Sequence, residues 1–291
     1  MEYLASPQIA SRMKHGEGAV WVERENCMLF PDCMDRVLWK WEENKYAKRI
    51  ALPFVPRAVL PNDPGGFLGV TADTVYLLNN NFSVRKMIRR FFLKKGEEFN
   101  DCRCGPDGSL YLGTMKAEDH NNRFLRLSPN GEVTVLLDRV SCSNGFVWSK
   151  DETVLYYTDT THHEIYAFDV DGKGQLQNRR TVFSVDGAMP DGLTIDAEDK
   201  IWAAMWGMGA VLRVDTETGE IIDSVRLNTS YPSSVCFAGS GSHTLMVTTS
   251  RKGISAAKVS PDGCLTAGDV YKATVATSGR IKAVYAGQFH V

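Results

Sequence analysis

The stretch "NGFVWSKDETVLYYTDTTHHEIYAFDV" (residues 144–170) decides the fold, because short runs of β-branched and aromatic residues alternate in it with turn residues. Such runs, bounded by turns, are typical of β-strands. The stretch predicts strands at Gly145–Ser149, Val154–Thr158 and Glu164–Val170, and "RRTVFSV" (179–185) adds a fourth. We therefore expect one four-stranded antiparallel sheet from this part of the chain.

Similar stretches occur along the whole chain. They begin at residues 17, 57, 100, 144, 191 and 234, with spacings of 40, 43, 44, 47 and 43 residues. A repeat of about 40–50 residues with four strands is typical of a β-propeller. We expect an all-β, six-bladed β-propeller formed by a single domain (1–291), with a ligand or metal site at the mouth of the central channel. Its end segments, "YLASPQIASRM" (3–13) and "AVYAGQFHV" (283–291), are expected to pair and close the ring.

The charge balance of the chain argues against polyanionic partners. Its 33 Lys and Arg residues face 35 Asp and Glu residues, which gives a net charge of −2. This balance offers no electrostatic basis for binding nucleic acid or a membrane surface. The first residues lack the pattern of a secretory signal. We therefore expect a cytoplasmic monomer or small homo-oligomer that acts on a small molecule.

Polar residues open the first strand of every predicted blade. In a four-stranded blade these residues converge at one mouth of the channel, and carboxylates and carboxamides gathered there require water, a cation or a polar ligand. Such hard oxygen donors suit Ca²⁺, Mg²⁺ or Mn²⁺. The alternative is that the Asn and Asp side chains only form turns, as in "MPDGLTID" (189–196). The six positions are Glu17, Arg57, Asn100, Asn144, Asp191, and Ser233 or Ser234.

The loops between the second and third strands should reach the same mouth. His162 and His163 could supply a general base, or belong to a solvated rim. Trp206 could line the pocket or pack between blades. The other polar residues in or beside these loops are Lys116, Glu118, Asp159 and Arg251.

Several motifs resemble those of the SMP-30/gluconolactonase/luciferin-regenerating enzyme family, also called the regucalcin-like family. The resemblance implies a six-bladed propeller that binds one divalent cation (Ca²⁺, Mg²⁺, Mn²⁺, Zn²⁺ or Fe²⁺) and usually hydrolyses sugar lactones in carbohydrate metabolism. The motifs are "GEGAVW" (16–21), "FNDCRCGPDGSLYLGTM" (99–115), "SNGFVWSKDETVLYYTD" (143–159) and "MPDGLTIDAEDKIWAAMWGMGAVLRVD" (189–215).

By this resemblance, Glu17, Asn144 and Asp191 are the metal ligands, and Asn100 and Glu118 contact the substrate. The chain departs from the family where an Arg is usual, because Glu98 stands there. A reversed charge beside the ligand is expected to change which substrate is accepted.

These residues lead to a metal-dependent lactonase as the first hypothesis. The cation would act as a Lewis acid on the ring carbonyl, and Asp191 would take a proton from the attacking water, with Glu118 or Glu98 as alternative bases. A G-x-S-x-G nucleophile motif is absent from the sequence. One alternative is a non-catalytic, Ca²⁺-binding or ligand-binding regulatory propeller. Another is a protein-interaction propeller with a solvated channel.

Overall fold

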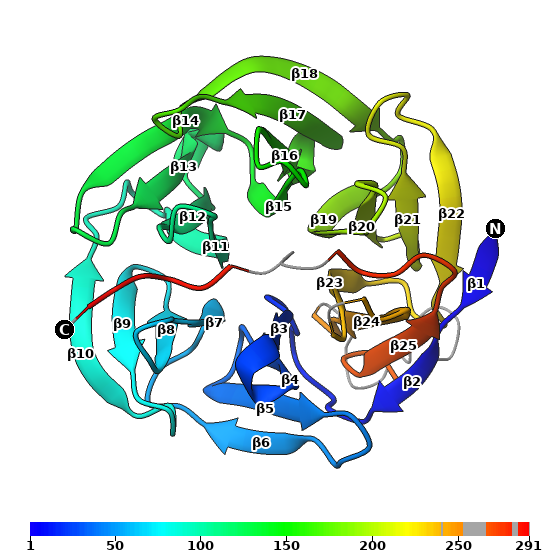
Figure 1. Cartoon of the computed structure of the whole chain (residues 1–291), viewed down its shortest axis with the longest axis horizontal. Helices are drawn as coiled ribbons and strands as arrows, with labels where there is room; N and C mark the ends of the chain where they lie inside the picture. The colour runs from blue at the N-terminus through cyan, green and yellow to red at the C-terminus, as the bar shows by residue number, and fades with distance from the viewer. Residues whose placement is uncertain (240, 253–265, 281–284, 291) are drawn as a thin grey trace.

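Six antiparallel sheets surround a central channel in the computed structural model, which describes residues 1–239, 241–252, 266–280 and 285–290 (Figure 1). Five of the sheets have four strands. The sheet of the fifth blade has one additional strand at its outer edge. The predicted six-bladed β-propeller is therefore confirmed. The stretch 253–265 of the sixth repeat lies outside the described residues.

Each of the first four blades runs from its inner to its outer strand in chain order. The first two comprise β3 (Val20–Val22), β4 (Cys27–Asp32), β5 (Val37–Glu42) and β6 (Lys48–Ala51), then β7 (Ala58–Pro61), β8 (Phe67–Val70), β9 (Thr74–Leu78) and β10 (Val84–Arg90). The next two comprise β11 (Glu98–Cys104), β12 (Leu110–Met115), β13 (Asn122–Leu127) and β14 (Val133–Val140), then β15 (Ser143–Trp148), β16 (Val154–Asp159), β17 (Glu164–Val170) and β18 (Leu176–Ser184).

The last two blades also use strands from the N-terminus. They comprise β19 (Met189–Ile195), β20 (Ile201–Trp206), β21 (Ala210–Val214), β22 (Ile221–Arg226) and β1 (Glu2–Leu4), then β23 (Pro232–Phe237), β24 (Thr244–Thr249), β25 (Val270–Thr274) and β2 (Ser6–Ile9). The helices of the described residues are the short 3-10 turns Glu23–Glu25, Glu118–His120 and Thr160–His162. No helix in the described part of the chain is long and apolar enough to cross a membrane.

The fourth blade follows the sequence pattern closely. The third strand, Glu164–Val170, has the predicted bounds, and the second extends one residue further, to Asp159. Aromatic side chains from the third and fourth blades pack together, with the rings of Phe124 and Phe146 4.8 Å apart and edge to face. Aromatic burial of this kind is a large part of what joins neighbouring blades.

The two chain ends close the ring differently from the expectation. β2 pairs antiparallel with β25 and becomes the outer strand of the last blade, whereas β1 adds in parallel to β22. The described C-terminal residues instead lie near the loops that follow the inner strands, where Gly287 bridges Asn62 (Figure 1). The prediction that the end segments pair with each other is therefore wrong. Pairing with an existing sheet covers the edge that β25 would otherwise expose.

β-Bulges interrupt the inner strands where the predicted polar positions lie. In the fifth blade the register shifts between Pro190 and Leu193, so the Pro-Asp-Gly sequence forms a bulge within β19. Corresponding shifts occur in β11, β15 and β23. A Cβ atom on Gly145 would lie 2.3 Å from the amide nitrogen of Leu193, so this glycine lets two inner strands approach closely. Bulges re-aim side chains, and here they occur beside the channel.

Candidate functional site

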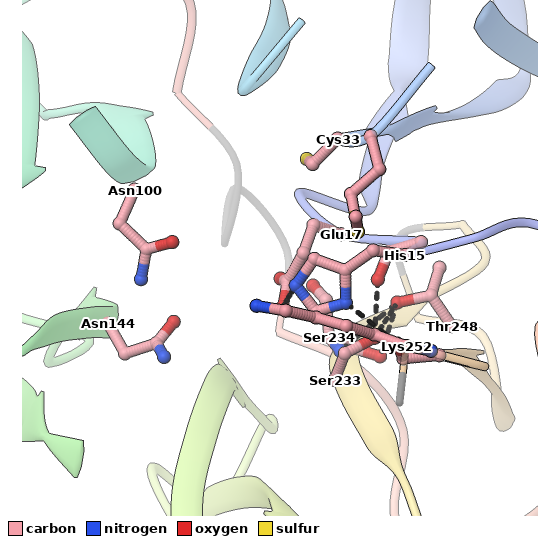
Figure 2. A network of polar contacts seen from close by, with 12 residues as sticks. His15, Glu17, Cys33, Asn100, Asn144, Ser233, Ser234, Thr248 and Lys252 are labelled. Atoms are coloured by element: carbon pink, nitrogen blue, oxygen red, sulfur yellow. Dashed lines mark hydrogen bonds and ion pairs between the residues drawn. The ribbon is translucent and has the colours of Figure 1, made fainter. Parts of the chain in front are cut away.

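Glu17, Asn144 and Asp191 are buried in the structure, although all three are polar. The charge of Glu17 raises the pKa of Asp191, and the neighbouring Asn144 side chain acts in the opposite direction, so the three residues are close together. Figure 2 shows Asn144 and Asn100 facing Glu17 across the channel. The three residues that the motifs mark as metal ligands therefore come together from three different blades.

Two of the three side chains, Asn144 and Asp191, each present a buried oxygen atom that has no hydrogen-bond partner among the described residues. Asn144 Nδ2 donates to Thr160 Oγ1 over 3.1 Å. Its Oδ1 atom and Asp191 Oδ1 are buried without a hydrogen-bond partner among the described residues. Buried oxygens of this kind usually have a partner, and hard oxygen donors suit divalent cations. The donor set of Glu17, Asn144 and Asp191 therefore fits a divalent cation.

Acidic side chains alone do not provide enough ligands for a metal ion at this site. In the described ranges, no group of three or more His, Cys, Asp or Glu side chains is arranged to hold a metal ion. The site would have two carboxylates, and its third protein ligand would have to be the carboxamide of Asn144. This mixture favours oxygen-preferring cations over a structural zinc site.

Burial and mutual repulsion disfavour the ionised forms of these carboxyl groups. Burial, followed by the charge of Asp101, raises the pKa of Glu17 from 4.5 to about 8. Burial and then the charge of Glu17 raise the pKa of Asp191 well above its usual range. Two neighbouring acids in a poorly hydrated site resist carrying two negative charges. A divalent cation would remove that penalty.

Two residues of the site were missed by the sequence analysis. His15 Nε2 lies 3.5 Å from Glu17 Oε1, and its Nδ1 is 2.9 Å from Ser250 Oγ. Burial, followed by the charge of Lys252, lowers the pKa of His15 to about 3, so the imidazole is neutral near pH 7. Asp101 is a third buried acid, with Oδ1 unpartnered among the described residues. The sequence could have indicated both residues, because His15 lies two residues before Glu17 and Asp101 directly follows Asn100.

The predicted substrate residues occupy different depths. Asn100 Nδ2 donates to the Ser143 carbonyl over 2.9 Å, and its carboxamide oxygen faces the channel (Figure 2). Glu98 is partly buried and forms ion pairs with Arg57 and Lys116. Glu118 lies exposed on the rim and pairs with Lys95 at 2.8 Å. Asn100 and Glu98 are therefore more buried than Glu118 and better placed to contact a ligand inside the mouth.

The two serines predicted at the mouth form hydrogen bonds within the protein. Ser233 Oγ donates to the Gly16 carbonyl over 2.5 Å, and Ser234 Oγ accepts from the Ala19 amide. These bonds attach the first blade to the last. Arg251, from the same mouth, is exposed.

The histidine pair has structural contacts. His162 Nδ1 lies 2.9 Å from Asp159 Oδ2, and His163 Nδ1 lies 2.6 Å from the Ala188 carbonyl. Asp159 also accepts hydrogen bonds from the Ser141 and Cys142 amides, which hold the start of β15. These contacts favour the rim interpretation over a catalytic role for the pair.

Trp206 forms part of an aromatic wall beside the buried acids. Its ring lies 4.8 Å from that of Tyr231 and meets the His15 imidazole edge to face at 5.6 Å. Because His15 contacts Glu17, the indole is near the candidate ligands. The pocket-wall interpretation is therefore favoured over packing between blades alone.

Comparisons with known proteins agree with this geometry. The family model described as "SMP-30/Gluconolactonase/LRE-like region" matches residues 15–251. The chain belongs to this family. Human regucalcin is 32% identical over 274 residues, covering 89% of this chain and 90% of that protein. The matched range includes Glu17, Asn144 and Asp191.

Solved structures of other family members have the same fold. Regucalcin from Agrobacterium tumefaciens, described as a calcium-binding protein, superposes with a TM-score of 0.87 at 23% identity, covering 98% of this chain and 99% of that one. A gluconolactonase from Xanthomonas campestris gives 0.73 at 18% identity, covering 93% and 89%. These structures show the shared fold, and the family match together with human regucalcin supports a lactonase-like or regucalcin-type function.

Proposed function

We propose that the protein is a divalent-metal-dependent hydrolase of a sugar lactone or a related cyclic ester. The observation that carries the proposal is the meeting of Glu17, Asn144 and Asp191, with buried oxygens left unpartnered among the described residues. The family membership and the gluconolactonase neighbour support it. The small-molecule substrate and the cytoplasmic location belong to the same proposal.

Asp191 is the proposed general base. Its Oδ1 atom has no hydrogen-bond partner in the described part of the chain, so it can accept a proton from the attacking water. Glu98 is already paired with two cations, and Glu118 lies on the exposed rim. A cation held by Glu17, Asn144 and Asp191 would supply Lewis-acid stabilisation of the charge that develops on the carbonyl oxygen.

Other residues of the chain position the substrate and the ligands. The Asn100 amide is oriented by its bond to Ser143, so its oxygen can accept a hydrogen bond from a sugar hydroxyl. His15 contacts Glu17 and limits its movement. Trp206 and Tyr231 form an aromatic wall on one side of the site. Together these contacts would hold a small polar ring beside the proposed base.

A regulatory, calcium-binding propeller is the second candidate, favoured by the regucalcin relatives and by the calcium-binding neighbour. It would use the same ligands without turnover. An interaction propeller has less support, because the most exposed large apolar side chains, Tyr46, Phe92 and Leu4, come from different parts of the ring.

Proton release from a panel of aldonolactones near neutral pH tests the proposal. Wild type, Glu17→Gln and Glu42→Gln are compared after chelation and after adding back Ca²⁺, Mg²⁺, Mn²⁺, Zn²⁺ or Fe²⁺. Glu42 is the matched control because it is only partly buried and pairs with Lys45 at the opposite face. We expect metal-restored turnover above spontaneous hydrolysis in wild type and Glu42→Gln, with a large loss in Glu17→Gln.

The other outcomes separate the candidates. Cation binding without turnover on any lactone would reject the hydrolase and favour the regulatory propeller. Equal turnover in chelated and metal-loaded protein would reject the metal dependence. Absence of both turnover and cation binding would reject both candidates.

A further inference from the structure

Two cations converge on one carboxylate at the channel mouth. Arg57 Nη2 lies 2.7 Å and Lys116 Nζ 2.5 Å from the same atom, Glu98 Oε1. The Arg57 side chain is 12% exposed and that of Lys116 is 55% exposed. The two cations thus lie at different depths: Arg57 is near the buried Glu17, and Lys116 is largely in solvent. The single negative charge of Glu98 lies between them.

A third cation gives the mouth a surplus of positive charge. Lys252 lies beside His15 and Glu17 in Figure 2, and no ion pair joins it to any acid among the described residues. Lys252, Arg57 and Lys116 all act on the His15 imidazole, so they share one region. The Lys95–Glu118 pair on the rim adds no net charge. Outside the proposed metal ligands, these three cations share the mouth with two carboxylates, Glu98 and the buried Asp101, which leaves one positive charge in excess.

The backbone at Lys116 has an uncommon conformation. Lys116 follows β12 with φ of +67°, a left-handed conformation that is uncommon for a residue with a side chain. Uncommon backbone conformations persist where the surrounding structure enforces them, and they are frequent at ligand sites. Here the conformation occurs at the point where the Lys116 side chain turns back to Glu98.

We propose that the preferred substrate carries an anionic group, a carboxylate or a phosphate, in addition to its lactone ring, and that Arg57 and Lys116 bind this group. This inference rests on the proposed lactonase function for the nature of the ring. Paired guanidinium and ammonium donors form charge-assisted hydrogen bonds with such anions. Glu98 orients the two donors from a single oxygen, and Arg57 Nη1 also donates to the Cys33 carbonyl over 3.5 Å. The ammonium of Lys116 keeps further N–H groups for the ligand.

Ligands that a lactonase cannot hydrolyse separate anion recognition from catalysis. Methyl glucoside, methyl glucoside 6-phosphate and methyl glucuronide share one neutral ring and differ in charge. Calorimetric titration of the Ca²⁺-saturated protein at low ionic strength should show at least tenfold tighter binding of one or both anionic ligands than of methyl glucoside. The better anionic ligand identifies phosphate or carboxylate as the group, and added salt should reduce the preference.

Charge variants test where the anion binds. Lys116→Gln should reduce the preference about tenfold, and Glu98→Gln should increase it, because the competing carboxylate is removed. Lys45→Gln is the control, since Lys45 pairs with Glu42 at the opposite face and should leave the preference unchanged. Equal binding of all three ligands by wild type would overturn the inference. So would a preference that survives in Lys116→Gln, which would point to direct binding of the anion to Ca²⁺.

Turnover distinguishes this inference from the proposed function. Hydrolysis of neutral lactones with no preference for carboxylated or phosphorylated ones would overturn the inference and leave the lactonase proposal intact. An anion preference that depends on Lys116, without hydrolysis of any lactone, would overturn the lactonase proposal and leave an anion site. Preferred hydrolysis of the anionic lactones, lost in Lys116→Gln, would support both.

Discussion

Strand β19 carries one aspartate near its start, Asp191, and a second follows its last residue, Asp196. Both are buried, with 4% and 0% of their surfaces exposed. Asp191 leaves Oδ1 without a partner among the described residues. Asp196 instead accepts hydrogen bonds from the amides of Glu198 and Lys200, from Trp202 Nε1 and from Arg213 Nε.

The difference shows how one strand separates stability from function. At Asp196 the charge is paired and the carboxylate receives four hydrogen bonds, so it is expected to hold the blade together. At Asp191 the neighbours are other acids, and burial disfavours the charged form. An acid that the protein leaves unsatisfied can be satisfied by a ligand. The same substitution at the two ends should therefore have opposite consequences.

Asp191→Asn should give the largest effect, on catalysis. We expect kcat for the best lactone to fall on the order of 10³-fold, because the proposed base is lost. The metal-free protein should keep its stability, since the substitution removes a repulsion with Glu17. Proton release and thermal unfolding measure the two quantities. A kcat within tenfold of wild type would show that another group takes the proton.

Asp196→Asn should give the next largest effect, on stability. Placing an amide group against Trp202 and Arg213 breaks a buried hydrogen-bonded pair, and we expect a loss of about 3 kcal/mol in the free energy of unfolding. Turnover per folded molecule should be retained below the unfolding transition. Asp169→Asn is the control, because Asp169 forms an exposed pair with Arg180 and should matter little. If both variants unfold alike, the network around Asp196 is not stabilising.

Cation binding should stabilise the fold by a somewhat smaller amount. A ligand at 100 times its Kd that binds only the folded state adds about 2.7 kcal/mol. We expect unfolding temperatures to rise from chelator to saturating cation in wild type and in Asp196→Asn. In Asp191→Asn the rise should be much smaller. Unchanged unfolding in all five cations would contradict the proposed metal centre.

The fold could be predicted because its information is local. Each blade repeats short apolar runs and turns, and the bounds of Glu164–Val170 were obtained from the pattern alone. Ring closure was not predictable in the same way, since β2 and β25 lie more than 250 residues apart and pair through their backbones. Backbone pairing over such a separation leaves little mark on either segment.

The candidate site was predictable in position and less so in detail. The phase of the repeat placed Glu17, Asn144 and Asp191 at one mouth, and the structure brings them together. The partners of Glu98 were not evident, because its ion pairs depend on side-chain directions in two other segments. His15 was missed for the same reason. Contacts between blades require coordinates, whereas positions within a blade follow from the period.

The pH dependence of stability should give the smallest effect and sharpens the contrast within β19. In the metal-free protein the pKa of Glu17 is raised from 4.5 to about 8, and that of Asp191 shifts in the same direction. Unfolded chains release these protons at lower pH than the folded state does, so the stability contributed by Glu17 and Asp191 is present at low pH and is lost as pH rises from about 4.5 toward 8. We expect a loss of about 1–2 kcal/mol, less than the pKa difference allows, because water can enter the mouth.

Urea unfolding at several pH values, in chelator and in saturating Ca²⁺, measures this slope. The cation stabilises the ionised carboxylates, so it should remove the decline, and Asp191→Asn should weaken the decline without metal. Asp196→Asn should lower stability at every pH in this window and leave the slope unchanged, because its partner is a permanently charged arginine. A metal-free stability that is flat or rising between pH 5 and 7.5 would show that the acids at the mouth are already neutralised by the protein, and that the two ends of β19 differ less than their contacts indicate.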